Sequence, residues 1–419
     1  MSEVEASFRQ ESARLVSLLV RAFGPSRLQL AEDVVQETFL RALKSWAVNG
    51  PPPNRGAWLT RVAKNLAVDA LRREGVYAAD GQLRLEQAFI STFDPSTLDD
   101  AELEMLFLCC HPAIAQETQI ALILRELCGL STKEIAKALL VKEDAVAQRL
   151  VRGKRALAGE PLDCEPDQLH ERLETVLSAI YLLFNEGYSA HSDAALTRSE
   201  LCDDAILLTQ RLSKTSVGDR PETQALLALM WFHSSRLPAR LSAEGAALLL
   251  EDQDRSLWDQ ARIGAGLRCL AASASGAQIS RFHFEAGIAA EHALAESYEA
   301  TRWTRVLESY DGLAALLPTP VVLLNRAVPL AMVNGPEVGL KQIEEIEEAK
   351  ELQSYHLLPS MKGRLLEMLE RPEEARVQYE KALALAVNPA EQKLLRRRLV
   401  AVGSPSPGSA EPFPLRSIS

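Results

Sequence analysis

A dense group of hydrogen-bond donors lies between Ser131 and Arg155. This stretch holds seven basic residues against three acidic ones, a local charge of +4 in a chain whose net charge is −11. Long Arg and Gln side chains donate hydrogen bonds to base edges in the DNA major groove, and Lys and Arg bind phosphate groups. The candidate DNA-binding residues are Lys142, Gln148, Arg149, Arg152, Lys154 and Arg155, of which the last two are assigned to phosphates.

Two short helices would have to position these donors. The apolar spacing predicts helices over residues 131–139 and 142–156, joined by a short turn. Ser131 or Thr132 can cap the first helix, with Glu134 placed for a capping box. The second helix of a helix-turn-helix enters the major groove. The alternative is an ordinary solvated pair of amphipathic helices, because such a pair has the same spacing.

A second basic helix is predicted directly after a run of three prolines, which cannot continue the preceding helix. Asn65, Asp69 and Arg72 recur at i+4 and i+3 spacing, so they share one face of this helix. Arg61 and Lys64 lie beside that face. Such a surface can hold a single strand and read an unstacked base on its polar edges. A salt-bridged surface helix is the alternative interpretation.

An acidic, amphipathic helix is predicted over residues 31–46. Its expected polar face carries Glu32, Asp33, Glu37 and Arg41. Its expected buried face carries Val34, Val35, Thr38, Phe39 and Ala42. A helix of this kind marks either a protein-binding surface or plain solvent exposure.

These three segments, in this order, resemble the RNA polymerase sigma factors of the extracytoplasmic-function type. The segments are AEDVVQETFLRA, WLTRVAKNLAVDALRRE and LSTKEIAKALL with VKEDAVAQRLVRGKRAL, and the resemblance covers most of residues 8–160. It implies that the first segment binds the β′ clamp of core RNA polymerase and that the second melts and reads the −10 element. It also implies that the third reads the −35 element beside the polymerase β flap.

The resemblance carries over residue by residue. It implies polymerase contacts for Asp33, Gln36 and Glu37. For the −10 element it implies Asn65, Asp69 and Arg72, with Arg61 and Lys64 beside them. For the −35 element it implies Lys142, Gln148, Arg149 and Arg152. The family's loop that captures a flipped base follows near residues 72–77, where this sequence offers no motif that matches.

The chain continues well beyond the third segment, to residue 419. The segments LFLCCHPAIAQETQIALILRELCGLSTKEIA, AIYLLFNEGYSA and LLEDQDRSLWD, with a late repeat over 355–385, resemble the sigma-factor subgroup with a C-terminal tetratricopeptide-like extension. The resemblance implies that the extension regulates the factor, in place of or alongside an anti-sigma protein, and that a further regulatory protein binds it. A generic α-helical domain is the alternative.

The composition favours an all-α fold. Hydrophobic residues make up 47% of the chain and aromatic residues only 5%, and the abundant Ala and Leu are strong helix formers. The expected parts are a region 2 domain (8–75), a linker (76–98), a region 4 domain (99–160), a helical-repeat regulatory domain (167–402) and a disordered tail (403–419).

Several classes of function are not supported by the sequence. No apolar run reaches the roughly 18 residues that cross a bilayer, so no membrane contact and a cytoplasmic location are expected. The six Cys are scattered without a CxxC pair and are expected as buried thiols. Cys109-Cys110-His111 has no matching ligand pair, so no metal or other cofactor is expected. No nucleophile–base set or phosphate loop indicates an enzyme.

The charge distribution bears on the main alternative. Residues 1–160 carry 20 basic and 21 acidic side chains, a balance of −1, and the remainder is strongly acidic. A near-neutral DNA reader fits a subunit that binds DNA firmly only when polymerase supplies most phosphate contacts. The alternative is a one-component transcription regulator that binds duplex DNA by itself and senses a ligand through its helical repeats.

Overall fold

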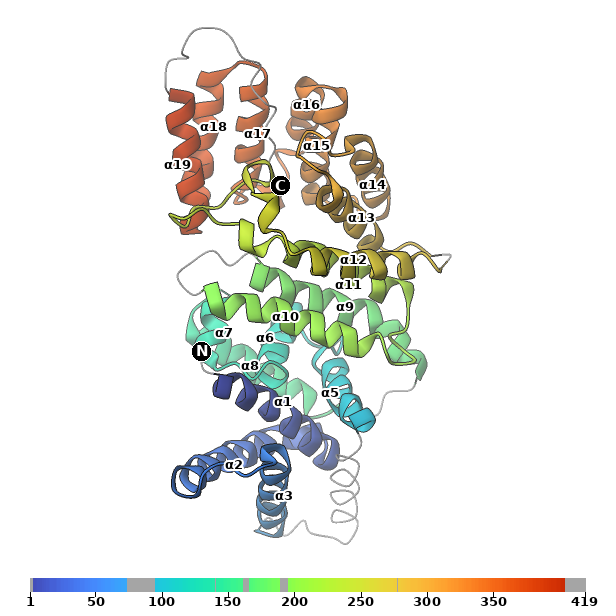
Figure 1. Cartoon of the computed structure of the whole chain (residues 1–419), viewed down its shortest axis with the longest axis vertical. Helices are drawn as coiled ribbons and strands as arrows, with labels where there is room; N and C mark the ends of the chain where they lie inside the picture. The colour runs from blue at the N-terminus through green and yellow to red at the C-terminus, as the bar shows by residue number, and fades with distance from the viewer. Residues whose placement is uncertain are drawn as a thin grey trace. The chain divides into compact units, whose positions relative to one another are not determined.

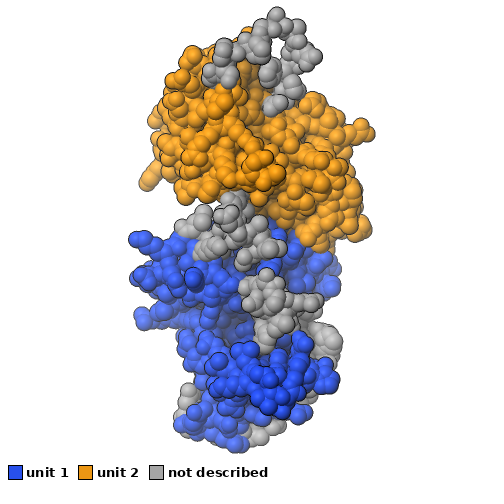
Figure 2. Space-filling view, turned by 60° about the vertical axis from the view of Figure 1, so that its left-hand side comes forward, with its two compact units in different colours: residues 1–187, 196–219 blue, residues 188–195, 220–419 orange. Residues whose placement is uncertain are grey.

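The computed structural model describes residues 3–73, 95–139, 141–160, 166–188, 195–276 and 278–403. All regular elements in these ranges are helices and no β-strand occurs among them, which confirms the all-α prediction (Figure 1). The chain divides into two compact units (Figure 2). Unit 1 comprises residues 1–187 and 196–219, and unit 2 comprises residues 188–195 and 220–419. The predicted tail, from residue 404 on, and most of the predicted linker lie outside the described ranges.

Unit 1 begins with three helices, α1 (Glu3–Phe23), α2 (Leu28–Asn49) and α3 (Arg55–Arg73). The chain turns between α1 and α2 at Gly24, whose φ of 85° favours glycine. Gly50, with φ of 72°, and the three prolines after it separate α2 from α3. The rings of Trp46 and Trp58 then meet across the α2–α3 contact, with centroids 5.5 Å apart.

Four further helices of unit 1 follow. They are α5 (Pro95–Cys109), which begins inside the range expected for the linker, α6 (Gln116–Glu126), α7 (Thr132–Ala138) and α8 (Glu143–Leu157). Helix α1 packs on α5, where Arg21 and Glu104 form an ion pair (3.5 Å). Helix α8 approaches α6 closely at Gly153, because a Cβ there would lie 2.8 Å from Thr118 Cγ2.

The first two helices of the C-terminal extension also belong to unit 1. They are α9 (Pro166–Tyr188), whose last residue is assigned to unit 2, and α10 (Ala195–Leu212). Arg211 of α10 forms an ion pair with the largely buried Glu102 of α5. The extension therefore makes a direct contact with α5, which precedes α6 and the helix-turn-helix segment.

Unit 2 is an array of helices in which each helix from α13 onward packs against the next. Its longer helices are α11 (Pro221–Ser235), α12 (Gln260–Ser273), α13 (Arg281–Leu294), α14 (Trp303–Leu316), α15 (Pro320–Asn334), α16 (Pro336–Ile346), α17 (Leu357–Met368), α18 (Pro372–Leu385) and α19 (Pro389–Gly403). Short 3₁₀ turns connect some of them: η3 (Leu237–Ala239), η4 (Leu250–Asp252), η5 (Arg255–Leu257) and η6 (Lys350–Leu352). Neighbour-to-neighbour packing is the arrangement expected of a helical-repeat array.

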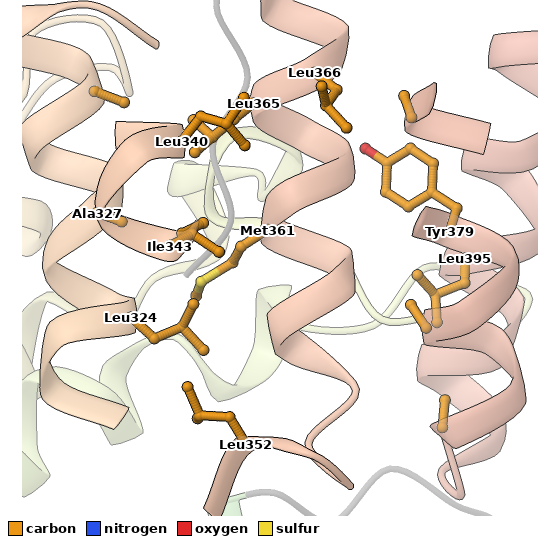
Figure 3. Close-up of a cluster of buried hydrophobic side chains, with 14 residues drawn as sticks. Leu324, Ala327, Leu340, Ile343, Leu352, Met361, Leu365, Leu366, Tyr379 and Leu395 are labelled. Carbon is orange, nitrogen blue, oxygen red and sulfur yellow. The ribbon is translucent and has the colours of Figure 1, made fainter. Parts of the chain in front are cut away.

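Small residues allow these helices to pack closely. A Cβ on Gly339 would lie 2.7 Å from the Ala327 carbonyl oxygen, so α16 can sit against α15 only with glycine here. Gly363 likewise lets α17 pack closely against α18, because a Cβ at this position would lie 3.0 Å from the Tyr379 ring. Figure 3 shows the apolar core that results, with Met361 and Leu365 of α17 between side chains of the neighbouring helices.

Four of the five described cysteines are buried thiols, as the sequence predicts, and Cys269 differs. Cys109, Cys110, Cys128 and Cys202 are buried free thiols, Cys269 is half-buried, and Cys164 lies outside the described residues. Within the described ranges no group of three or more His, Cys, Asp and Glu side chains is placed to hold a metal ion. In the same ranges no helix combines the length and apolarity needed to span a membrane.

Candidate nucleic-acid and polymerase interface

Helices α7 and α8 form the predicted helix-turn-helix, with boundaries within one residue of those expected. Ser131 caps α7 through a capping box: its Oγ accepts from the Glu134 N–H (3.2 Å), and its own N–H donates to Glu134 Oε2 (2.8 Å). Buried side chains hold the two helices together, as predicted for Ile135, Ala136, Val146 and Leu150; Leu139 is only half-buried.

Most of the predicted donors of α8 reach solvent. Lys142, Gln148, Arg152 and Arg155 are exposed, and Arg149 is half-buried beside them. The Arg152 Nε donates to the Gln148 carbonyl oxygen one turn earlier (3.3 Å). The structure thus brings five of the six predicted −35 residues to the surface of one helix and its first turn.

Lys154, the sixth predicted −35 residue, does not lie on this exposed surface. Its Nζ forms an ion pair with Glu32 of α2, and it lies 3.6 Å from Glu126 Oε1 of α6. Arg125 Nε also donates to Glu32 Oε1, at 3.2 Å. Glu32 is 5% exposed, so its expected place on the polar face of α2 is wrong: two cations from residues 99–160 hold it inside the unit.

Helix α3 presents the predicted −10 residues as one stripe. Arg61, Asn65, Asp69 and Arg72 are exposed, and Lys64 is half-buried. Arg73 Nε donates to the Asp69 carbonyl oxygen, at 3.2 Å. The opposite face of α3 is buried, at Leu59, Ala63, Leu66, Ala67 and Leu71.

Helix α2 exposes the three predicted polymerase-binding residues, Asp33, Gln36 and Glu37. Asp33 accepts from Gln29 Nε2 (3.2 Å), and Glu37 pairs with Arg41 (2.9 Å). Leu40 and Leu43 are also exposed on this helix, by 51% and 59%. Leu40 lies four positions after Gln36 and Leu43 lies seven positions after it. Both leucines therefore extend the helix face that carries Asp33 and Gln36.

The two leucines were missed in the sequence-based assignment. The prediction of the buried face of α2 is confirmed for Val34, Val35, Thr38 and Ala42, which are buried. Phe39, also predicted on this face, is half-buried. Leu40 and Leu43 do not fit that face. Their position off the buried stripe was the available signal that they are exposed.

Glu32, Arg125, Glu126 and Lys154 form the Glu32 cluster, and a cleft of about 170 Å³ opens beside it. It is lined by Ser12, Val16, Glu32, Val35, Gln36, Phe39, Arg125, Glu126 and Gly129. Gln36, a predicted polymerase contact, therefore borders side chains of both α2 and α6. The two predicted DNA-binding modules of unit 1 are in direct contact here.

Glu126 titrates unusually within this cluster. Its side chain is 1% exposed, and burial, with the neighbouring Glu32 carboxylate, raises the pKa of Glu126 to about 7. Lys154 and Arg125 act in the opposite direction. Because the folded carboxyl binds a proton more tightly than the unfolded one, its contribution to stability is greatest below about pH 4.5 and declines up to about pH 7.

We therefore expect Glu126→Gln to remove the part of the stability loss at rising pH that comes from deprotonation of the Glu126 carboxyl. The difference in free energy of unfolding between wild type and E126Q should change by up to about 1.4 kcal/mol per pH unit between pH 5 and 7, with wild type losing stability as pH rises. Titrating groups that do not interact with Glu126 cancel in this difference. Chemical denaturation at several pH values measures it, and parallel stability curves for the two proteins would contradict the assignment.

The fold and these surfaces define an all-helical protein of the helix-turn-helix class. Comparison with protein families agrees with the segments described above. The model of sigma-70 region 2 matches residues 8–76, and that of sigma-70 region 4 matches residues 104–157. A family of unknown function, DUF6596, matches residues 172–274.

Similar proteins include both long and short chains. An uncharacterised protein of Rhizobium meliloti (strain 1021) is 39% identical over 401 residues, covering 92% of this chain and 94% of the relative. The ECF RNA polymerase sigma factor SigE of Mycolicibacterium smegmatis is 30% identical over 158 residues, covering 36% of this chain and 58% of the relative. SigX of Bacillus subtilis, another ECF sigma factor, is 27% identical over 139 residues, which cover 30% of this chain and 68% of the relative. No solved structure matches significantly.

This chain thus contains sigma-70 region 2 and region 4 within its first 160 residues, is similar there to extracytoplasmic-function sigma factors, and continues into a helical C-terminal extension.

Proposed function

We propose that this protein is a sigma factor that binds core RNA polymerase and directs transcription initiation at specific promoters. The observation that carries the proposal is the presence of both sigma-70 regions in one unit, with most of their candidate contact residues exposed on α2, α3 and α8. A regulator that bound only duplex DNA would need the helix-turn-helix but not the exposed stripes on α2 and α3.

Helix α2 is the proposed polymerase-binding element, directed at the β′ clamp. Asp33, Gln36 and Glu37 supply polar contacts, and Leu40 and Leu43 supply apolar area. An interface core of apolar side chains with a polar rim is the usual composition of a protein–protein contact. Region 4 is expected to bind the β flap.

The two DNA-reading helices have separate tasks. Helix α3 holds the melted −10 strand with Asn65, Asp69 and Arg72, supported by Arg61 and Lys64. Helix α8 reads the −35 duplex with Lys142, Gln148, Arg149 and Arg152, and Arg155 binds a phosphate. Lys154 can bind a phosphate only after its ion pairs with Glu32 and Glu126 open.

The extension is proposed to regulate the factor through unit 1. Support comes from α10, whose Arg211 pairs with Glu102 of α5 within the segment that leads into region 4. Because the Glu102 side chain is only 10% exposed, a change at Arg211 alters a contact that solvent does not screen strongly. A regulatory protein that binds the extension is a further proposed partner.

In vitro transcription tests the proposal. Core polymerase with this protein should start transcripts at a promoter selected from genomic fragments, and core polymerase alone should not. Arg211→Glu should change the yield if the extension regulates region 4, whereas Arg376→Glu, an exposed position of α18, should not. Absence of specific transcripts with a folded chain would contradict the sigma-factor function, and equal yields for both variants would contradict only the regulatory role.

A further inference from the structure

Unit 2 contains a cluster of cationic and aromatic side chains that the proposed function does not use. We define the cationic cluster as Arg236, Arg255, Trp258, His292 and Trp303. Arg236 directly follows α11, Arg255 lies in η5 with Trp258 just after it, His292 lies in α13, and Trp303 begins α14. Helices α11, α13 and α14 pack in series (Figure 1).

The five side chains form a chain of contacts. The Arg255 guanidinium carbon lies 4.4 Å from the Trp258 ring centroid, and the Arg236 guanidinium carbon lies 5.9 Å from the same centroid. Arg255 Nη1 donates to the carbonyl oxygens of His292 (2.8 Å) and Ala295 (2.7 Å). The His292 and Trp303 rings meet edge to face, with centroids 5.5 Å apart.

The cluster is positive and largely buried. Arg236 and His292 are each 8% exposed and Trp258 is 3% exposed. Among the residues that the structure describes, no ion pair joins Arg236 or Arg255 to a carboxylate. Burial, followed by the charges of Arg236 and Arg255, lowers the pKa of His292 to about 3, so this imidazole is neutral at neutral pH. Two guanidinium groups thus lie on one tryptophan. The carboxylate of Glu299 attracts Arg255 only from beyond ion-pair distance, and no carboxylate forms an ion pair with Arg236 within the described ranges.

The same side chains carry buried polar atoms that make no hydrogen bond within the described structure. They are Arg236 Nε, Arg255 Nη2, Trp258 Nε1, His292 Nδ1 and Trp303 Nε1. Guanidinium and indole N–H groups can only donate hydrogen bonds. Buried donors without acceptors are costly and rare in folded proteins, so a set of them beside two guanidinium groups that form no ion pair indicates a missing acceptor with negative charge.

We propose that the cationic cluster binds an oxyanion group of a small molecule, a phosphate or a carboxylate. An oxyanion offers several acceptor lone pairs and a counter-charge, and guanidinium groups bind it with charge-assisted hydrogen bonds. Arg236 and Arg255 supply the charge, and the Trp258 indole N–H supplies a neutral donor. This site is independent of the proposed function, because it lies in unit 2 and requires neither polymerase nor DNA.

Isothermal titration calorimetry on the full chain tests the proposal. Sodium phosphate and sodium malonate are titrated separately, with sodium chloride at matched ionic strength as the reference. We expect saturable binding of at least one of the two oxyanions and none of chloride. Arg236→Gln should weaken that binding about tenfold or more, the usual effect of losing a hydrogen bond from a charged group. Tighter phosphate binding identifies a phosphorylated ligand, and tighter malonate binding identifies a carboxylate.

Two further variants make the test decisive. Trp258→Phe keeps a six-membered aromatic ring beside the two guanidinium groups and removes the pyrrole part of the indole with its N–H donor, so it should weaken binding severalfold. It decides the question if circular dichroism shows that R236Q is misfolded. Arg376→Gln removes an exposed guanidinium from α18 and should leave binding unchanged. No saturable binding of either oxyanion, or equal affinity in wild type, R236Q and W258F, would overturn the proposal.

Discussion

Replacing Arg149 and Arg152 together by alanine is expected to lower transcription from a cognate promoter about 100-fold. Both side chains lie on the solvent side of α8, where Arg152 is exposed and Arg149 half-buried. A well-placed contact from Arg to a base contributes about 1–3 kcal/mol of discrimination, so two contacts account for a loss of this size. Run-off transcription with core polymerase measures the effect.

The double variant should remain folded. Alanine is the strongest helix former, and neither arginine has an ion pair with a carboxylate among the described residues, so the helix should be as stable as before. Arg376→Ala, which removes one exposed arginine from α18, is the control. This variant should support transcription at the wild-type level. Transcription within twofold of wild type by a folded R149A/R152A protein would remove α8 from the promoter contact.

Replacing Leu40 or Leu43 by aspartate is expected to weaken binding to core polymerase about 100-fold. These leucines are 51% and 59% exposed on α2, beside Gln36 and Glu37. Burying the exposed part of a leucine contributes about 1 kcal/mol, and placing a carboxylate in the same apolar contact costs more because it loses its hydration. Fluorescence anisotropy of labelled protein titrated with core polymerase gives the affinity.

A matched control exists in unit 2. Val377 is 47% exposed on α18, so Val377→Asp makes the same kind of change away from α2. Surface substitutions of this type change stability by less than about 0.5 kcal/mol, so all three variants should fold normally. If L40D and L43D bind core polymerase as tightly as V377D does, the exposed face of α2 is not the polymerase contact.

The local features of the helix-turn-helix could be predicted because short-range chemistry determines them. The Ser131 capping box depends on two residues three positions apart, and the buried face of α8 follows the helical period at Val146 and Leu150. The same reasoning placed Val34, Val35, Thr38 and Ala42 in the core. In each case the residues that decide the structure are close in sequence.

The Glu32 cluster could not be predicted in this way. Arg125 and Lys154 lie 93 and 122 positions from Glu32 in sequence, and helical spacing alone places a glutamate on the polar face. Only the packing of two modules reveals that Glu32 is buried. For the same reason Lys154 was assigned to a phosphate, since its sequence neighbours are basic and its carboxylate partners are far away in sequence.

The cationic cluster illustrates a second limit. Its members span Arg236 to Trp303 and come from separate elements joined by 3₁₀ turns and loops. No short motif contains them, and each is an ordinary residue in its own segment. Their burial and their unpaired donors become visible only when α11, α13 and α14 are placed together.

The most direct test of the central claim is an electrophoretic mobility shift of a promoter fragment by the purified full chain, with and without core RNA polymerase. We predict a stable, promoter-specific complex only when both proteins are present, together with a complex of the chain and core polymerase in the absence of DNA. Tight binding of the chain alone to duplex DNA, without association with core polymerase, would contradict a sigma factor and indicate a one-component regulator.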